Sequence, residues 1–185
     1  MDPVENVYAA GTIVSLRPPA EADIDAGWTA WFNDETVVRH LVSQYWPNSR
    51  ESQRRYFDSL HAQRDRLVLS IVDSTDGKLV GTGSLSSINF VHRYAYIAVV
   101  IGAREFHKGP VAMEAYNLFL RVAFRRLNLR TVISVSSSGN KSVHAVHRAV
   151  GFVEYGRIPA VYETGGELFD SVFSAVDATS WLERQ

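Results

Sequence analysis

A loop that opens a long predicted helix carries the strongest chemical signal in this chain. Residues 101–120, IGAREFHKGPVAMEAYNLFL, have the pattern of a strand end, a short loop with a glycine, and a helix. The first backbone N–H groups of a helix have no intrahelical acceptor and lie at the positive end of the helix dipole. The loop therefore predicts a site for phosphate groups close to Lys108 and Gly109.

A second predicted helix brings further polar residues towards the same region. Its sequence, NKSVHAVHRAVGF, begins at Asn140 and ends at Gly151. As an N-cap, Asn140 would stabilise the helix by about 1 kcal/mol and needs no other role. His147 lies at the border of the apolar stripe, which leaves two interpretations open: a half-buried histidine bonded to a neighbour, or a proton donor. A metal site at His144 and His147 lacks a visible third ligand, so no metal is expected.

A mixed α/β sheet is expected to position these residues within a single domain, 1–185. The pattern predicts a hairpin of two strands, then a strand, the long helix, a strand, the second helix and two final strands. The strand over 93–102 is continuously apolar, which predicts a central strand buried on both faces. The predicted strands are 12–17, 68–72, 79–88, 93–102, 130–135, 152–159 and 168–176, and the predicted helices are 21–32, 35–42, 49–63, 111–127 and 140–150.

Composition limits the classes of function. The chain has 185 residues, a formal net charge of −1 and no cysteine, which excludes disulfides, thiolate–zinc sites and a cysteine nucleophile. The balanced charge and the lack of a long basic stripe predict that neither nucleic acid nor a membrane is a partner. The N-terminal residues have no secretory pattern and no apolar run is long enough to span a bilayer, so we expect a cytoplasmic location.

The order of these elements resembles a known enzyme family. The segments SLRPPAEADIDAGWTAWFND, KLVGTGSLSSINFVHRYAYIAVVIG and NKSVHAVHRAVGFVEYGR resemble those of the GNAT-fold, acetyl-CoA-dependent N-acetyltransferases. The resemblance is strongest to the branch of RimJ/RimL-like ribosomal-protein acetyltransferases and amino-sugar-nucleotide acetyltransferases. It implies an α/β GNAT fold with a mixed, mostly antiparallel sheet and helices on both faces. It also implies acetyl-CoA as co-substrate, with no metal.

The resemblance implies transfer of an acetyl group to a primary amine of a small molecule, such as a nucleotide-linked amino sugar. Two alternatives remain open: a protein N-terminus as the acceptor, and a catalytically weak GNAT-fold module that binds acyl-CoA. We expect a monomer or a homodimer.

The resemblance also assigns roles to particular residues. It places the pantetheine arm and the oxyanion against the central strand, the pyrophosphate against the loop and Asn140 beside the arm. Pro110 departs from the family pattern, because a glycine is usual there and proline has no N–H to give. The cofactor-binding residues implied are Val99, Val100, Ile101, His107, Lys108, Gly109, Val111, Ala112 and Asn140.

The catalytic and acceptor residues that the resemblance implies match the family pattern less closely. His147 stands where many members have a tyrosine, the general acid for the leaving thiolate. Tyr96 stands where a glutamate is common, and its reference pKa of about 10 makes it a poor base. Other candidates for the base are His92, Asp34 and Glu35. In the family, the early helical region shapes the acceptor pocket, and here it contains Trp31, Asn33 and Tyr45. Together with His92, these are the implied substrate residues.

Overall fold

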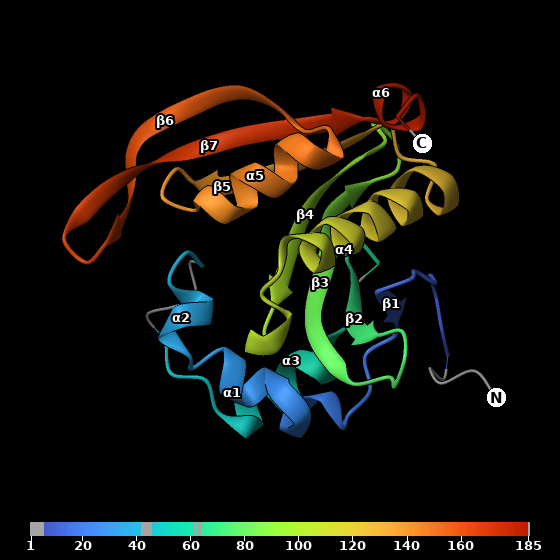
Figure 1. Cartoon of the computed structure of the whole chain (residues 1–185), viewed down its shortest axis with the longest axis vertical. Helices are drawn as coiled ribbons and strands as arrows, with labels where there is room; N and C mark the ends of the chain where they lie inside the picture. Colours follow the sequence, from blue (N-terminus) through green and yellow to red (C-terminus); the bar gives the residue numbers. More distant parts are fainter. Residues whose placement is uncertain (1–5, 42–45, 61, 63, 185) are drawn as a thin grey trace.

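A seven-stranded sheet forms the centre of the molecule (Figure 1). The computed structural model describes residues 6–41, 46–60, 62 and 64–184. The strand order is β1-β2-β3-β4-β5-β7-β6, and every neighbouring pair is antiparallel except β4 and β5, which run parallel. This confirms the expected mixed, mostly antiparallel sheet. The strands are β1 (Val14–Arg17), β2 (Leu67–Asp73), β3 (Leu79–Asn89), β4 (Tyr94–Ile101), β5 (Thr131–Ser137), β6 (Val153–Thr164) and β7 (Glu167–Asp177).

Helices pack on both faces of this sheet. Successive residues of a strand point to opposite faces. Val80 on β3 joins the larger core under α4, whereas its neighbour Leu79 packs with Trp28 in a second, smaller core. The helical elements are η1 (Ile24–Trp28), α1 (Thr29–Trp31), α2 (Glu35–Val38), α3 (Arg50–Ser59), η3 (Arg104–Phe106), α4 (Gly109–Arg121), η4 (Val122–Arg126), α5 (Lys141–Val150) and α6 (Ala178–Leu182). Within the described residues, no helix is long and apolar enough to cross a membrane.

The long helix α4 is fixed to the sheet at two points. Its buried residues recur at helical spacing, and the ring of Phe119 fills the space beside Gly83, where an added Cβ would lie 2.5 Å from that ring. The carboxylate of Glu114 accepts hydrogen bonds from the N–H groups of Thr12 (2.8 Å), Ile13 (2.7 Å) and Val14 (2.7 Å). These bonds attach the start of β1 to α4.

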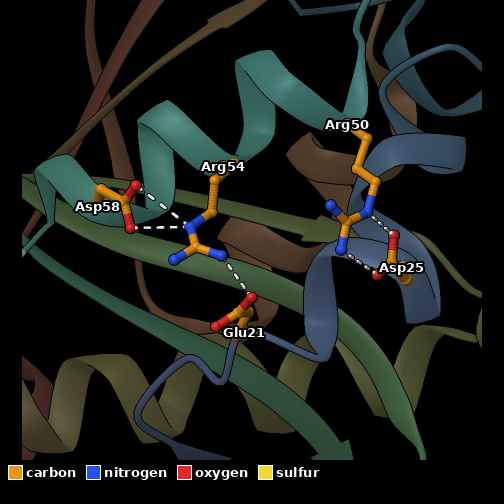
Figure 2. Close-up of polar contacts among 5 residues, drawn as sticks. All are labelled: Glu21, Asp25, Arg50, Arg54 and Asp58. Carbon is orange, nitrogen blue, oxygen red and sulfur yellow. Dashed lines mark hydrogen bonds and ion pairs between the residues drawn. The ribbon is translucent and has the colours of Figure 1, made fainter.

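Exposed ion pairs and one buried tryptophan hold α3 against the first helical segment. Figure 2 shows Arg50 reaching Asp25 (2.7 Å), and Arg54 reaching both Glu21 and Asp58. Pairs this exposed contribute only a few tenths of a kcal/mol each. Burial of Trp28, which is 1% exposed, contributes more, about 2 kcal/mol. The ion pairs therefore set the orientation of α3 more than they set stability.

The environment of β4 differs from the sequence prediction. Ala95 and Ile97 are buried, but Tyr96 is 37% exposed and Ala98 is exposed. The expectation that this strand is buried on both faces is wrong, because one face packs under α4 while the other is open to solvent at these two residues. A run of apolar residues does not distinguish the two cases.

Two further differences concern the C-terminal part. The strand predicted to stop at residue 159 continues as β6 to Thr164, because Pro159 lies on an edge strand, where a missing N–H costs no ladder bond. The hairpin of β6 and β7 reaches away from the rest of the sheet (Figure 1). The short helix α6, capped by Asp177, was not predicted, since five residues carry too little periodicity.

Candidate active site

The central feature of the site is an opening within the sheet. β4 and β5 pair only at Tyr94↔Thr131, Ala95↔Val132 and Tyr96↔Ile133. Beyond these pairs the two strands continue without pairing to each other, while β4 stays bonded to β3 and β5 to β7. The backbone groups of β4 that face the opening are therefore available to an extended ligand with amide groups. Val99, Val100 and Ile101 lie along this stretch, as the prediction of a pantetheine site requires.

The N-terminus of α4 lies just beyond the end of β4. The N–H of Val111 bonds to the carbonyl of Lys108 (3.1 Å), and Pro110 has no N–H. The N–H of Gly109 makes no hydrogen bond within the described part of the chain. An added Cβ at Gly109 would meet nothing within 4 Å, so the backbone is open to a bulky group here. The loop is suited to phosphate but offers fewer donors than a loop without proline.

His107 is tied to the strand rather than free in the loop. Its Nε2 lies 2.9 Å from the carbonyl oxygen of Ile101. Since a carbonyl accepts, Nε2 carries the proton in this bond. The bond brings the end of β4 and the start of α4 together. Lys108 is exposed and adds positive charge at the turn. The assignment of residues 107–112 to pyrophosphate stays a prediction.

The second helix has the predicted ends. The side chain of Asn140 accepts a hydrogen bond from the N–H of Val143 (3.1 Å), and Gly151 ends α5 with φ of 99°. The N-cap role is confirmed, and the contact between Asn140 and pantetheine stays a prediction. His144, one turn into the helix, donates from Nε2 to the carbonyl of Ser137 (3.0 Å), which fixes α5 to the end of β5.

His147 is buried more deeply than its sequence position indicates. It is 2% exposed, and its ring stacks on Phe152 with 4.6 Å between centroids. Its Nε2 lies 3.4 Å from the hydroxyl of Tyr116 on α4, whose ring meets the imidazole edge-on. Burial, together with a smaller contribution from the charge of His144, lowers the pKa of His147 to about 4. His147 is therefore neutral near pH 7.

The hydrogen bond to Tyr116 indicates which nitrogen of His147 carries the proton. Burial raises the pKa of Tyr116 far above its usual value, so the hydroxyl keeps its proton. Within the described residues the hydroxyl has one partner, Nε2 of His147. Donation to Nε2 satisfies the buried O–H of Tyr116, whereas acceptance from Nε2 would leave that O–H without a partner, so we assign the donor role to Tyr116. The proton of the neutral imidazole then sits on Nδ1, which is buried and has no partner in the part of the chain described. His147 thus holds an unused N–H donor.

A second buried polar atom without a partner lies on the strand that borders the opening. The hydroxyl of Ser136, on the unpaired stretch of β5, makes no hydrogen bond to any described residue. Buried polar groups are normally satisfied, so Ser136 Oγ and His147 Nδ1 both indicate a missing partner. A polar arm with amide groups and a sulfur end fits this donor set. The residues present therefore fit the acyl-CoA that the resemblance implies.

Two predicted acceptor residues have structural contacts. The indole of Trp31 occupies the space beside Gly27 and Gly102, where added Cβ atoms would come within 2.5 Å and 2.0 Å of it. The amide of Asn33 donates to the carbonyl of Asn48 (2.7 Å) and accepts from its N–H (2.8 Å). Packing and loop bonding account for both residues, and their contact with substrate stays a prediction.

The remaining candidates lie apart from each other. His92 is in the turn before β4, where its N–H donates to the side chain of Asn89 (2.7 Å). This is the end of β4 that pairs with β5, and Ile101 lies about 30 Å away along the extended strand. Tyr96 lies between these ends on the open face. Tyr45 falls outside the described residues. The structure thus brings together the strand end and the loop, and leaves His92 at the far end of β4.

The candidate bases differ in their surroundings. Asp34 accepts hydrogen bonds from Thr36 and from Arg104 (2.8 Å), which lower its pKa and weaken it as a base. Glu35 is exposed on α2. Among the described residues, no group of three metal-ligating side chains could hold an ion.

Tyr116 was not predicted as a site residue, although a hydroxyl within an apolar helical stripe is a sign that a polar partner is needed.

Comparison with known proteins identifies the family. Residues 14–153, more than half of the chain, match the model of the acetyltransferase (GNAT) domain. The chain belongs to the GNAT acetyltransferase family. This GNAT protein is an N-acetyltransferase that transfers an acetyl group from acetyl-CoA, its co-substrate, to an amine. The expected GNAT fold and class of enzyme are confirmed.

Two proteins of known function that are similar in sequence to this chain indicate which branch of the family it resembles. Spermidine N(1)-acetyltransferase of Vibrio cholerae is 25% identical over 153 residues, which cover 82% of this GNAT chain and 86% of that protein. Spermidine N(1)-acetyltransferase of Escherichia coli K12 is 26% identical over 141 residues, 76% of this chain and 73% of that one. These relatives are spermidine acetyltransferases. They do not support the expected placement in the RimJ/RimL-like and amino-sugar-nucleotide branch.

A solved structure shows the same fold. The crystal structure of spermidine N-acetyltransferase from Vibrio cholerae in complex with CoA and spermine matches with a TM-score of 0.84 and 19% sequence identity. The match covers 93% of this GNAT chain and 99% of that chain. At this identity the match shows the fold alone.

Proposed function

We propose that this enzyme acetylates a primary amine of a small polyamine. The observation that supports the enzyme's use of a long acyl carrier is the opening between β4 and β5, bordered by unpaired backbone. The acceptor class is supported by the two relatives that act on spermidine, at 25% and 26% identity. The amine approaches from the open face of β4, where Tyr96 and Ala98 are exposed.

In this proposal the chain holds both reactants and supplies one hydrogen-bond donor to the leaving group. Val99, Val100 and Ile101 bond the pantetheine arm, and the loop at Gly109 faces the pyrophosphate. The amine nitrogen forms a bond to the thioester carbonyl carbon, the carbon–sulfur bond breaks, and the thiolate leaves with the bonding pair. Nδ1–H of His147 donates a hydrogen bond to that thiolate. The ammonium formed on the acceptor loses its proton to solvent or to a nearby base.

A second acceptor class is favoured by the charges in the early helical region. A polyamine carries several positive charges, which carboxylates would bind. Here Asp25 is paired with Arg50 and Asp34 with Arg104. Glu21 is paired with Arg54 (Figure 2). Carboxylates that arginines already neutralise attract a polycation weakly. A monoamine with an apolar or neutral body is the alternative acceptor that this arrangement favours.

Thiol release with an amine panel separates these acceptors. The panel contains spermidine, spermine, phenethylamine, glucosamine and a peptide with a free N-terminus, each with acetyl-CoA. Turnover with spermidine or spermine above the rest supports the polyamine acceptor. Turnover with phenethylamine above the polyamines supports the monoamine. If thermal shift shows acetyl-CoA binding but no amine releases thiol, the chain is an acyl-CoA-binding module and the proposal fails.

A pair of glycine variants tests the position of the cofactor. Gly109→Val places a side chain where the pyrophosphate is proposed. Gly156→Val on β6 is the matched control, because an added Cβ there also meets nothing within 4 Å. Neither glycine has a positive φ, so neither substitution strains the free protein. Weaker CoA binding in Gly109→Val alone supports the assignment, and equal binding in both variants contradicts it.

A further inference from the structure

A groove with a volume of about 430 Å³ lies at the other end of α4, away from the opening between β4 and β5. Gly109 and Arg121 are twelve residues apart on this helix, which separates them by about 18 Å. The groove is formed by the N-terminal segment and the end of the helix, and it is lined by Val7, Tyr8, Ala9, Ala10, Arg121, Val122, Arg125 and Arg126. None of these residues has a role in the proposed acetyl transfer.

A π-helical turn gathers three arginines at this groove. α4 continues into the π-helix η4, closed by a hydrogen bond from the N–H of Leu127 to the carbonyl of Val122 (3.0 Å). In a π-turn the bond joins residues five apart, so Arg121 and Arg126 come to the same side, next to Arg125. In a regular α-helix, residues five apart point in different directions. The irregular turn therefore concentrates positive charge at one place.

Two of the three guanidinium groups are held in position. Arg121 donates from Nη2 to the carbonyl of Ala10, and the guanidinium of Arg126 lies 4.2 Å from the centre of the Tyr8 ring. Such an aromatic contact orients a guanidinium without using its donors. Arg125 makes no hydrogen bond or ion pair with any described residue and is exposed. Donors of Arg125 and Arg126 thus remain free for a ligand.

The charge of the groove is not compensated by its own lining. The described lining residues include three arginines and no acidic side chain, although the whole chain has a formal net charge of −1. Like charges held close together repel, and an anion relieves that repulsion. The floor between the arginines is apolar, formed by Val7, Ala9 and Val122. Ligand sites of this size commonly combine an apolar floor with a few polar groups.

We propose that this groove binds a small organic anion that carries a phosphate or carboxylate group on an apolar body. The anionic group meets Arg125 and Arg126, which can bind it through paired N–H donors. The apolar body lies against the floor, beside the Tyr8 ring. This site is distinct from the acetyl-CoA site, and its existence does not depend on the identity of the amine acceptor.

Calorimetry on the full chain saturated with CoA tests the proposal, because the CoA site is then filled. The probes are phenyl phosphate and phenylacetate at fixed ionic strength, with sodium chloride as the control for screening. We expect saturable binding of at least one probe. Arg125→Gln should weaken it about tenfold, the loss of one charge-assisted hydrogen bond. Since Arg125 is exposed and makes no hydrogen bond or ion pair with any described residue, this variant is expected to fold normally.

Arg148→Gln on α5, also an exposed arginine, is the matched control and should bind the probe as the wild type does. The proposal is overturned if the probe competes with CoA, or if Arg125→Gln and Arg148→Gln bind it equally. Preferential binding of phenyl phosphate or of phenylacetate identifies the anionic group.

Discussion

Replacing His147 by phenylalanine removes one buried N–H donor while keeping an aromatic ring between Tyr116 and Phe152. We expect kcat to fall and the affinity for acetyl-CoA to change little. The ring of His147 stacks on Phe152 at 4.6 Å, and a phenyl ring preserves that contact. The variant therefore tests the donor with little change in packing.

The size of the effect follows from the protonation state of His147. Burial lowers its pKa to about 4, so near pH 7 only about one molecule in a thousand carries an imidazolium. Three pKa units correspond to about 4 kcal/mol, which makes full proton transfer from the imidazolium costly. The neutral Nδ1–H can still donate a hydrogen bond to the leaving thiolate. A bond to a charged group contributes about 1.5–3 kcal/mol, so kcat should fall roughly 10- to 100-fold.

The assay measures thiol release under saturating amine, together with CoA affinity by calorimetry. His147→Tyr restores a donor and should retain much of the activity. Tyr116→Phe removes the group that holds the proton on Nδ1, so it should lower kcat less than His147→Phe does. Because His147 stays neutral, the kcat profile between pH 6 and pH 9 should contain no limb that disappears in His147→Phe.

Two outcomes would refute this reasoning. If His147→Phe turns over as fast as the wild type, His147 is a packing residue and the proton comes from elsewhere. If the variant loses CoA affinity as much as turnover, His147 binds the arm rather than assisting the leaving group.

Three further predictions concern the cofactor and stability. Gly109→Val should weaken CoA binding at least tenfold in calorimetry with the melting temperature unchanged, because the space around Gly109 is open in the free protein. Glu114→Ala should lower the free energy of unfolding by about 1–2 kcal/mol and the melting temperature by about 2–8 °C, since three N–H groups lose their acceptor. Burial raises the pKa of Glu114, but the hydrogen bonds from Val14 and Thr12 outweigh burial and keep the pKa below its usual value. The stabilisation by the Glu114 carboxylate is therefore present above about pH 4.3 and is lost as the pH falls below that value. The pKa of His147 is about 4 in the folded protein and about 6.5 in the unfolded chain, so between these pH values the unfolded state binds more protons. The free energy of unfolding should therefore fall by about 3 kcal/mol as the pH drops from 6.5 to 4. In urea titrations, His147→Phe should remove this pH dependence.

Local sequence signals predicted most of the elements. Asn140 and Gly151 are strong end signals because an N-cap amide and a left-handed glycine act within a few residues, and both ends of α5 were found. The π-helical turns were not predicted, since their bonds depend on packing along α4 rather than on a local motif. The continuation of β6 past Pro159 depends on its being an edge strand, which the sequence does not show.

Contacts between distant elements could not be predicted. The pairing of Tyr116 with His147 requires knowing that α4 and α5 lie side by side, and the two residues are 31 positions apart. The space beside Gly102 is filled by Trp31, whose early position had indicated a substrate contact. The opening between β4 and β5 depends on where parallel pairing stops. No residue type marks that point, whereas the family resemblance did indicate the strand that borders it.

The opening between β4 and β5 also divides the sheet mechanically. Strands β1 to β4 form one half-sheet and β5 to β7 the other, and only three residue pairs join them. Within the sheet, the pairing of Tyr94–Tyr96 with Thr131–Ile133 is therefore the only ladder that connects the two halves among the described strands. A ligand bonded to both borders would add a second connection, at the ends of β4 and β5 that do not pair with each other. Protection of the Ile97–Ile101 amides against deuterium exchange would then measure how tightly the halves are held.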